Sequence, residues 1–101
     1  MAISYQPGPG GSRTLLNISA PTQVKSGQGY VYRVRMIVEP TANGAVYDMA
    51  TGGTPSVANQ IAVIPYQPGN QEAYTVEIHA PFFEGLYIDP GTSGTVTVSY
   101  D

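Results

Sequence analysis

Apolar and polar residues alternate along most of this chain, which is the period of a β-strand with one buried face. The clearest example is the segment of residues 74–80. One side of this segment carries Tyr74, Val76, Ile78 and Ala80, and the other side carries Thr75, Glu77 and His79. The segment therefore predicts a strand with one face in the core and one in water.

Eight segments of this kind follow one another, separated by turn signals. They are residues 14–18, 22–25, 30–38, 45–49, 58–65, 74–80, 82–88 and 94–100. No stretch sustains a helical period, and evenly spaced short strands are typical of an antiparallel sandwich or barrel. The even strand number and the long central strand favour an all-β, jelly-roll-like sandwich, whereas periodicity leaves the strand order open.

The alternation also predicts which side chains face the core. In the long strand, the predicted core face carries Tyr30, Tyr32, Val34, Met36 and Val38, and the opposite face carries Val31, Arg33, Arg35 and Ile37. In the last strand, Val96, Val98 and Tyr100 are expected to point inward. The apolar run at residues 61–64 is consistent with a strand buried on both faces.

Turn formers mark the connections. Residues 26–29, 67–70 and 89–91 are expected to form turns, because they combine Gly, Pro, Asn and Asp. The segment 40–44 ends in Asn43-Gly44, which accommodates the positive φ values of a tight hairpin. Pro81 is expected to break or bend its strand, because proline donates no hydrogen bond to a ladder.

The N-terminal residues 1–12 read as a Pro/Gly arm, and residues 13–101 as a single domain. Ile3 and Tyr5 alternate with polar or small residues within this arm. Such a segment can dock as an added strand or lie across a neighbouring molecule. A frayed terminus is the alternative.

The composition of the chain excludes two classes of partner. Only 11% of the 101 residues are charged, the net charge is −3, and there are four Lys and Arg residues, too few for the phosphate contacts of a strong nucleic-acid site. The apolar runs are too short to span a bilayer, and the first residues lack the features of a signal peptide. We therefore expect neither nucleic acid nor membrane as a partner.

The chain has no Cys, which removes disulfides and thiolate metal sites. A small domain without such cross-links has a thin stability margin, and oligomerisation is one way to increase it.

Few residues are suited to catalysis. His79 has Glu77 on the same face as a candidate orienting carboxylate, but no nucleophile motif surrounds any Ser or Thr. The acidic residues Glu84, Asp89 and Asp101 do not form a calcium-binding loop. We therefore predict a protein that is not an enzyme, with no catalytic, cofactor-binding or metal-binding residues, and we interpret His79 as a surface or interface residue.

The sequence offers several interface candidates instead. Arg33 and Arg35 project from one face of the long strand. They can form cross-strand ion pairs if this strand pairs with the one that bears Glu77 and His79, or they can contact an acidic partner protein. Phe82 and Phe83 are consecutive, so one of them should leave the core unless a partner covers it. The predicted interface residues are Ile3, Tyr5, Arg33, Arg35, Phe82 and Phe83.

The order of short motifs along the chain is similar to that in a known group of proteins. The chain contains Tyr47-Asp48, Ile64-Pro65, Pro81-Phe82 and Gly85-Leu86, and it closes on the alternating run from Thr95 to Tyr100. Over roughly residues 24–100 this resembles small structural proteins of tailed bacteriophages. The Pro/Gly arm and the turn at Pro90 depart from the usual pattern.

The resemblance implies a component of the virion, a head decoration or cement protein made in the host cytoplasm. It implies binding to the major capsid protein at the capsid surface, and a dimer or trimer. Two alternatives remain open at this point. One is a tail- or fibre-associated virion protein, and the other is a carbohydrate-binding β-sandwich, which predicts a planar exposed row of tyrosines.

Overall fold

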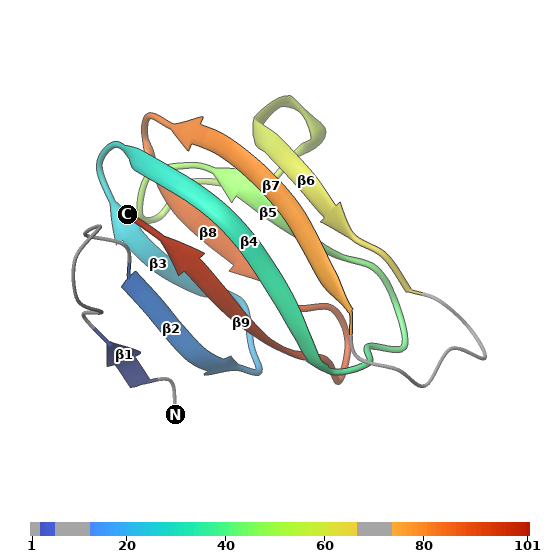
Figure 1. The fold of residues 1–101 in the computed structure, drawn as a ribbon. Helices are drawn as coiled ribbons and strands as arrows, with labels where there is room; N and C mark the ends of the chain where they lie inside the picture. Colours follow the sequence, from blue (N-terminus) through green and yellow to red (C-terminus); the bar gives the residue numbers. More distant parts are fainter. Residues whose placement is uncertain (1–2, 6–12, 67–73) are drawn as a thin grey trace.

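The computed structural model describes residues 3–5, 13–66 and 74–101, which form two antiparallel β-sheets packed face to face (Figure 1). The five-stranded sheet contains, in spatial order, β1 (Ile3–Tyr5), β2 (Arg13–Ile18), β9 (Thr95–Tyr100), β4 (Gly29–Val38) and β7 (Thr75–Phe82). The four-stranded sheet contains β3 (Thr22–Ser26), β8 (Gly85–Asp89), β5 (Gly44–Asp48) and β6 (Gln60–Ile64). The predicted all-β class with antiparallel strands is confirmed.

The strands pair in a nested manner. β2 pairs with β9, β3 with β8, β4 with β7, and β5 with β6, so strands early in the chain meet strands late in the chain. Two further pairings, β4 with β9 and β5 with β8, complete the two sheets. In Figure 1 the red strand β9 accordingly lies between the blue β2 and the teal β4.

The core lies between the two sheets and is apolar. The largest fully buried side chains of the described residues include Phe82, Ile18, Met36, Ile64, Leu86 and Ile88. Val96, Val98 and Tyr100 of β9 are buried as predicted, with Tyr100 only 4% exposed. Deleting the buried part of one such side chain typically costs about 2–5 kcal/mol, so these positions dominate the stability of the sandwich.

The predicted facing of Tyr30 and Tyr32 is wrong, because β4 contains a bulge that the alternation does not reveal. Val31 pairs with Tyr100 of β9 and Arg33 pairs with Ser99, so Tyr32 is an extra residue in β4. A bulge of this type reverses the side-chain alternation beyond it. Val31 and Val34 therefore both point into the core (0% exposed), and Tyr30 and Tyr32 are half-buried on the outer side.

A second bulge lies beside the first, on β7. Val31 pairs with Ala80 and Arg33 pairs with Glu77, so the two residues Ile78 and His79 stand opposite one residue of β4. His79 occupies the extra position with φ of 50°, in the left-handed region that only a few side chains adopt. The two bulges together turn the aromatic side chains at this end of the sheet outward.

Three other local predictions are also wrong. Residues 40–44 do not close a hairpin, since β4 and β5 belong to different sheets. Residues 61–64 are not buried on both faces, because β6 ends the order of its sheet and Val63 is 41% exposed. Pro81 does not end β7, which continues to Phe82; β7 lies at the end of its sheet, where proline is tolerated.

The predicted strand starts also shift at two places. A 3₁₀ turn, Val57–Asn59, replaces the beginning of the predicted strand 58–65, and β8 begins at Gly85 rather than at residue 82. The turn predicted at residues 26–29 is present, with Gly27 at φ of 85°. The turn predicted at residues 89–91 lies two residues later, where Gly94 donates to the Gly91 carbonyl oxygen (3.2 Å).

Ile3 and Tyr5 lie in β1, whose backbone pairs with β2 so that Ile3 faces Leu16 and Tyr5 faces Thr14. The remainder of the predicted arm, residues 1–2 and 6–12, and the predicted turn at residues 67–70 lie outside the described residues.

Candidate interaction surfaces

The paired bulges create a surface on the outer side of the five-stranded sheet, which we call the bulge face. Its members come from β4 and β7, and they are Tyr30, Tyr32, Arg33, Arg35, Glu77 and His79. The Tyr32 ring centroid lies 4.9 Å from that of Tyr30 and 6.4 Å from that of His79, which it meets edge-on at 80°. The three rings therefore form one continuous aromatic row.

Glu77 connects this row to the basic side chains. Its Oε1 accepts a hydrogen bond from His79 Nε2 (2.7 Å), and its Oε2 accepts one from Arg33 Nε (3.1 Å). These two donors, His79 first and Arg33 second, hold the pKa of Glu77 below its ordinary value. Glu77 is thus an ionised acceptor at neutral pH, and it fixes the orientation of both neighbours.

Arg33 and Arg35 differ in how firmly they are held. The predicted cross-strand ion pairing is confirmed for Arg33 and Glu77, whose side chains are about half exposed at 48% and 52%. Arg35 donates a long hydrogen bond of 3.4 Å to Thr75 Oγ1. A bond of that length is weak, so the Arg35 guanidinium can turn toward an acceptor on another molecule at little cost.

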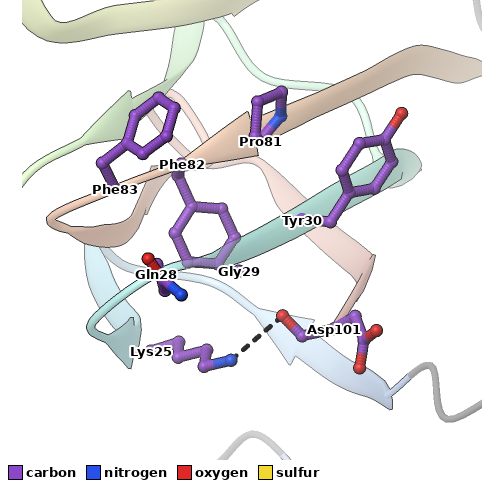
Figure 2. Close-up of a pocket in the computed structure, with 8 residues that line it drawn as sticks. All are labelled: Lys25, Gln28, Gly29, Tyr30, Pro81, Phe82, Phe83 and Asp101. Atoms are coloured by element: carbon purple, nitrogen blue, oxygen red, sulfur yellow. Dashed lines mark hydrogen bonds between the residues drawn. The ribbon is translucent and has the colours of Figure 1, made fainter.

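A second surface lies at one end of the sandwich, where an open hollow of about 440 Å³ is found. Eight residues line this end hollow, namely Lys25, Gln28, Gly29, Tyr30, Pro81, Phe82, Phe83 and Asp101. Figure 2 shows Phe82 in the middle of this group, with Phe83 and Pro81 on one side and Lys25 and Asp101 on the other. Tyr30 belongs to both surfaces, so the end hollow continues onto the bulge face.

The floor of the end hollow depends on Gly29. A Cβ atom at this position would collide with the Asp101 carbonyl oxygen and would come within 2.6 Å of Phe82 Cζ. Because glycine stands there, Lys25 Nζ reaches the Asp101 carbonyl oxygen (3.1 Å) and lies 6.0 Å from the Phe82 ring centroid. Tyr30 and Asp101 also exchange backbone hydrogen bonds of 3.2 and 2.7 Å, which fix the chain beside the hollow.

Phe83 stands at the rim of the hollow on a braced turn between β7 and β8. The Asp48 carboxylate accepts backbone N–H bonds from Phe83 (2.9 Å), Glu84 (2.7 Å) and Gly85 (3.3 Å). Gly27 of the β3–β4 turn donates to the Glu84 carbonyl oxygen (3.1 Å), so the two turns at this end are tied together. These bonds fix the backbone of the turn that carries the exposed Phe83 ring.

The structure separates the predicted interface residues. Phe82 is 0% exposed and Phe83 is 69% exposed, as their succession on one strand predicts. Arg33 and Arg35 lie on the bulge face, whereas Phe83 lies at the rim of the end hollow. Tyr30, which the sequence assigned to the core, is the residue that joins the two places.

Sequence reasoning missed the contributions of Lys25 and Asp48. Lys25 sits in a short strand with no pattern that distinguishes it from a solvated lysine. Asp48 acts on a turn that lies 35 to 37 residues further along the chain, a distance that no local motif reports.

Tyr74 lies away from both surfaces and ties β7 to the end of β6. Its hydroxyl donates to the Pro65 carbonyl oxygen. Burial raises the pKa of Tyr74, and the nearby Glu39 carboxylate raises it further. The hydroxyl is therefore a stable donor, which helps to fix the side of the sandwich where β6 and β7 meet.

His79 is half exposed (49%) and is not one of the residues that line the end hollow. Residues 13–66 and 74–101 hold no group of three or more His, Asp or Glu side chains arranged to bind a metal ion. Within the same residues, no helix has the length and the apolar character needed to cross a membrane.

Comparisons of the chain with protein-family models, with curated proteins and with solved structures found no match.

Proposed function

We propose that this protein is a non-enzymatic structural protein of a bacteriophage virion, a decoration or cement protein that binds the major capsid protein on the surface of the head. The observation that carries this proposal is the nested strand pairing, β2–β9, β3–β8, β4–β7 and β5–β6. This is the strand order expected of a jelly roll, and jelly rolls are common in viral capsid and lectin domains. Because one fold serves many functions, the exposed surfaces of this protein carry the rest of the evidence.

Both exposed surfaces support a role in adhesion. The bulge face presents aromatic and guanidinium groups, and the end hollow presents an exposed Phe83 beside an apolar floor. Interfaces between proteins are enriched in aromatic and Arg side chains. On a capsid the same contact repeats many times, so that a weak individual affinity is sufficient when contacts act together.

The bulge face is the surface that we assign to the capsid. Arg35 has a guanidinium that is only loosely held, and it lies on the same face as the Tyr30–Tyr32–His79 row, beyond the Arg33–Glu77 pair. A partner suited to this face presents carboxylates and aromatic or hydroxyl side chains, because guanidinium groups bind carboxylates in bidentate fashion.

The arm is the second proposed contact with the capsid. Deleting residues 1–11 should abolish particle binding while circular dichroism shows an intact fold, since β1 contributes only three residues to the edge of its sheet. The matched variant is Arg35→Glu in the full chain, which should weaken particle binding without touching the arm. Full occupancy of capsids by the truncated protein would show that the arm is dispensable.

Separating phage heads from tails, followed by mass spectrometry, tests the location. We expect the protein in the head fraction at many copies per particle. Recovery in the tail fraction would favour the tail- or fibre-associated alternative. Its absence from purified particles would refute the virion proposal altogether.

The carbohydrate-binding alternative requires tyrosine rings in one exposed plane. The Tyr30 and Tyr32 rings are tilted by 58°, and those of Tyr47 and Tyr87 on the four-stranded sheet by 53°. Neither pair forms a flat platform for a sugar ring, which favours the virion proposal. Binding on a glycan array that disappears in Tyr32→Ala would reverse this preference.

A further inference from the structure

The end hollow and Phe83 lie side by side on one surface, and each has a shape that the other fits. Phe83 projects from the rim with 69% of its surface exposed, and the hollow of about 440 Å³ beside it has room for a phenyl ring. A surface that carries both a projecting group and a receiving hollow is self-complementary, because a two-fold axis through it places each projection in the other hollow.

We propose that two copies of this chain associate through this surface, with the Phe83 ring of each copy entering the end hollow of the other. This goes beyond the proposed function, and it specifies as a two-fold dimer the dimer or trimer that the resemblance implies. Pro81 and Tyr30 would contact the entering ring.

The charges around the hollow fit a second copy. Lys25 and Asp101 lie on one side of the hollow, and Glu84 lies beside Phe83 on the turn at the other side. A two-fold axis through the surface brings Lys25 of each copy toward Glu84 of the other. A patch of a single sign would repel its own copy, whereas a patch with both signs attracts it.

The two turns beside the hollow are already fixed in the single chain, which favours association. Asp48 fixes the turn that carries Phe83, and the bond from Gly27 to Glu84 ties this turn to the neighbouring one. Binding therefore orders few groups that were free before, and little conformational entropy is lost.

The expected affinity of the isolated pair is low. A stable interface buries about 800 Å² on each partner, and a single hollow with one aromatic ring covers only part of such an area. Association should therefore depend strongly on concentration in solution. Neighbouring sites on a capsid would raise the effective concentration and favour the dimer there.

The test is sedimentation equilibrium of the full chain over a concentration series. The wild type should pass from monomer to dimer, and Phe83→Ser should lower the association constant by about tenfold or more, the loss expected for a central aromatic anchor. The control is Val57→Ser, which removes an apolar side chain even more exposed than Phe83 (87%) from the 3₁₀ turn and should leave association unchanged.

A charge-complementation experiment separates association from folding. Lys25→Glu and Glu84→Lys should each weaken self-association, because each places like charges opposite one another across the axis. An equimolar mixture of the two variants should recover association, since opposite charges then meet across the axis. A purely structural role of Lys25 would leave the mixture as weak as its components.

A wild type that stays monomeric at every concentration, or a Phe83→Ser variant that associates as strongly as the wild type, would overturn the proposal. In the first case the surface would be left for a different protein. These outcomes are independent of the head-and-tail analysis, so failure of the dimer and failure of the virion proposal can be told apart.

Discussion

The turn that presents Phe83 depends on one carboxylate, and Asp48→Ala is the sharpest test of this dependence. The variant removes the acceptor of three backbone N–H groups, at 2.7, 2.9 and 3.3 Å from the Asp48 oxygens. A hydrogen bond to a charged acceptor contributes about 1.5–3 kcal/mol, and the longest of the three contributes least.

Water can replace part of this acceptor, because Phe83 and Glu84 are exposed. We therefore expect Asp48→Ala to lower the free energy of unfolding by about 2–3 kcal/mol, a large part of the roughly 5–15 kcal/mol typical of a domain. For a chain of this size the melting temperature should fall by about 10–20 °C. Urea denaturation followed by circular dichroism measures both the midpoint and the slope.

Two further variants should lower the free energy of unfolding by smaller amounts than Asp48→Ala. Asp48→Asn keeps one oxygen acceptor for Glu84 and Gly85 and loses the bond from Phe83, so it should cost about 1 kcal/mol. Asp89→Asn makes the same change of charge at a side chain that accepts one local N–H bond, from Gly91 (2.9 Å), and should stay within about 0.5 kcal/mol of the wild type. If Asp48→Ala also stayed within that range, the brace would not exist as described.

Three other predictions concern the bulge face and the core. His79 and Arg33 lower the folded-state pKa of Glu77 below its ordinary value of 4.5, so ionised Glu77 stabilises the fold above pH 4.5 and this stabilisation is lost as the pH falls through the folded-state pKa. In urea titrations the difference in unfolding free energy between wild type and Glu77→Gln should therefore shrink below pH 4.5. A difference that stays constant with pH would contradict this. Because His79 has φ of 50°, His79→Gly should be more stable than His79→Ala by about 1 kcal/mol in the same assay, whereas equal stability would show that the bulge relaxes. Phe82→Ala should cost about 3–5 kcal/mol and Phe83→Ala less than about 0.5 kcal/mol, and similar costs would mean that both rings are packed.

Local alternation was sufficient to find most of the strands. The pattern around Val96, Val98 and Tyr100 placed β9 within one residue of its observed start and predicted its buried face correctly. The opposite burial of Phe82 and Phe83 followed from the same period. These features depend only on neighbours in the sequence.

Local alternation did not predict the two bulges or which sheet each strand joins. A bulge is one extra residue in a ladder, and nothing in the order of Tyr30, Val31 and Tyr32 marks which of them is extra. The segment 40–44 has the residues of a hairpin turn, yet the strands on either side find better partners far away in the chain. Tyr30, at the junction of both candidate surfaces, was consequently assigned to the wrong side.

The nested order of the strands has a consequence for how the protein is made. The partner of β2 is β9, so the five-stranded sheet stays incomplete until β9 has left the ribosome. Folds dominated by such distant contacts form slowly, in about milliseconds to seconds, and the apolar residues of early strands stay uncovered meanwhile. During synthesis the apolar residues of the early strands are therefore exposed before β9 is available. At high expression such nascent chains would aggregate unless chaperones bind them.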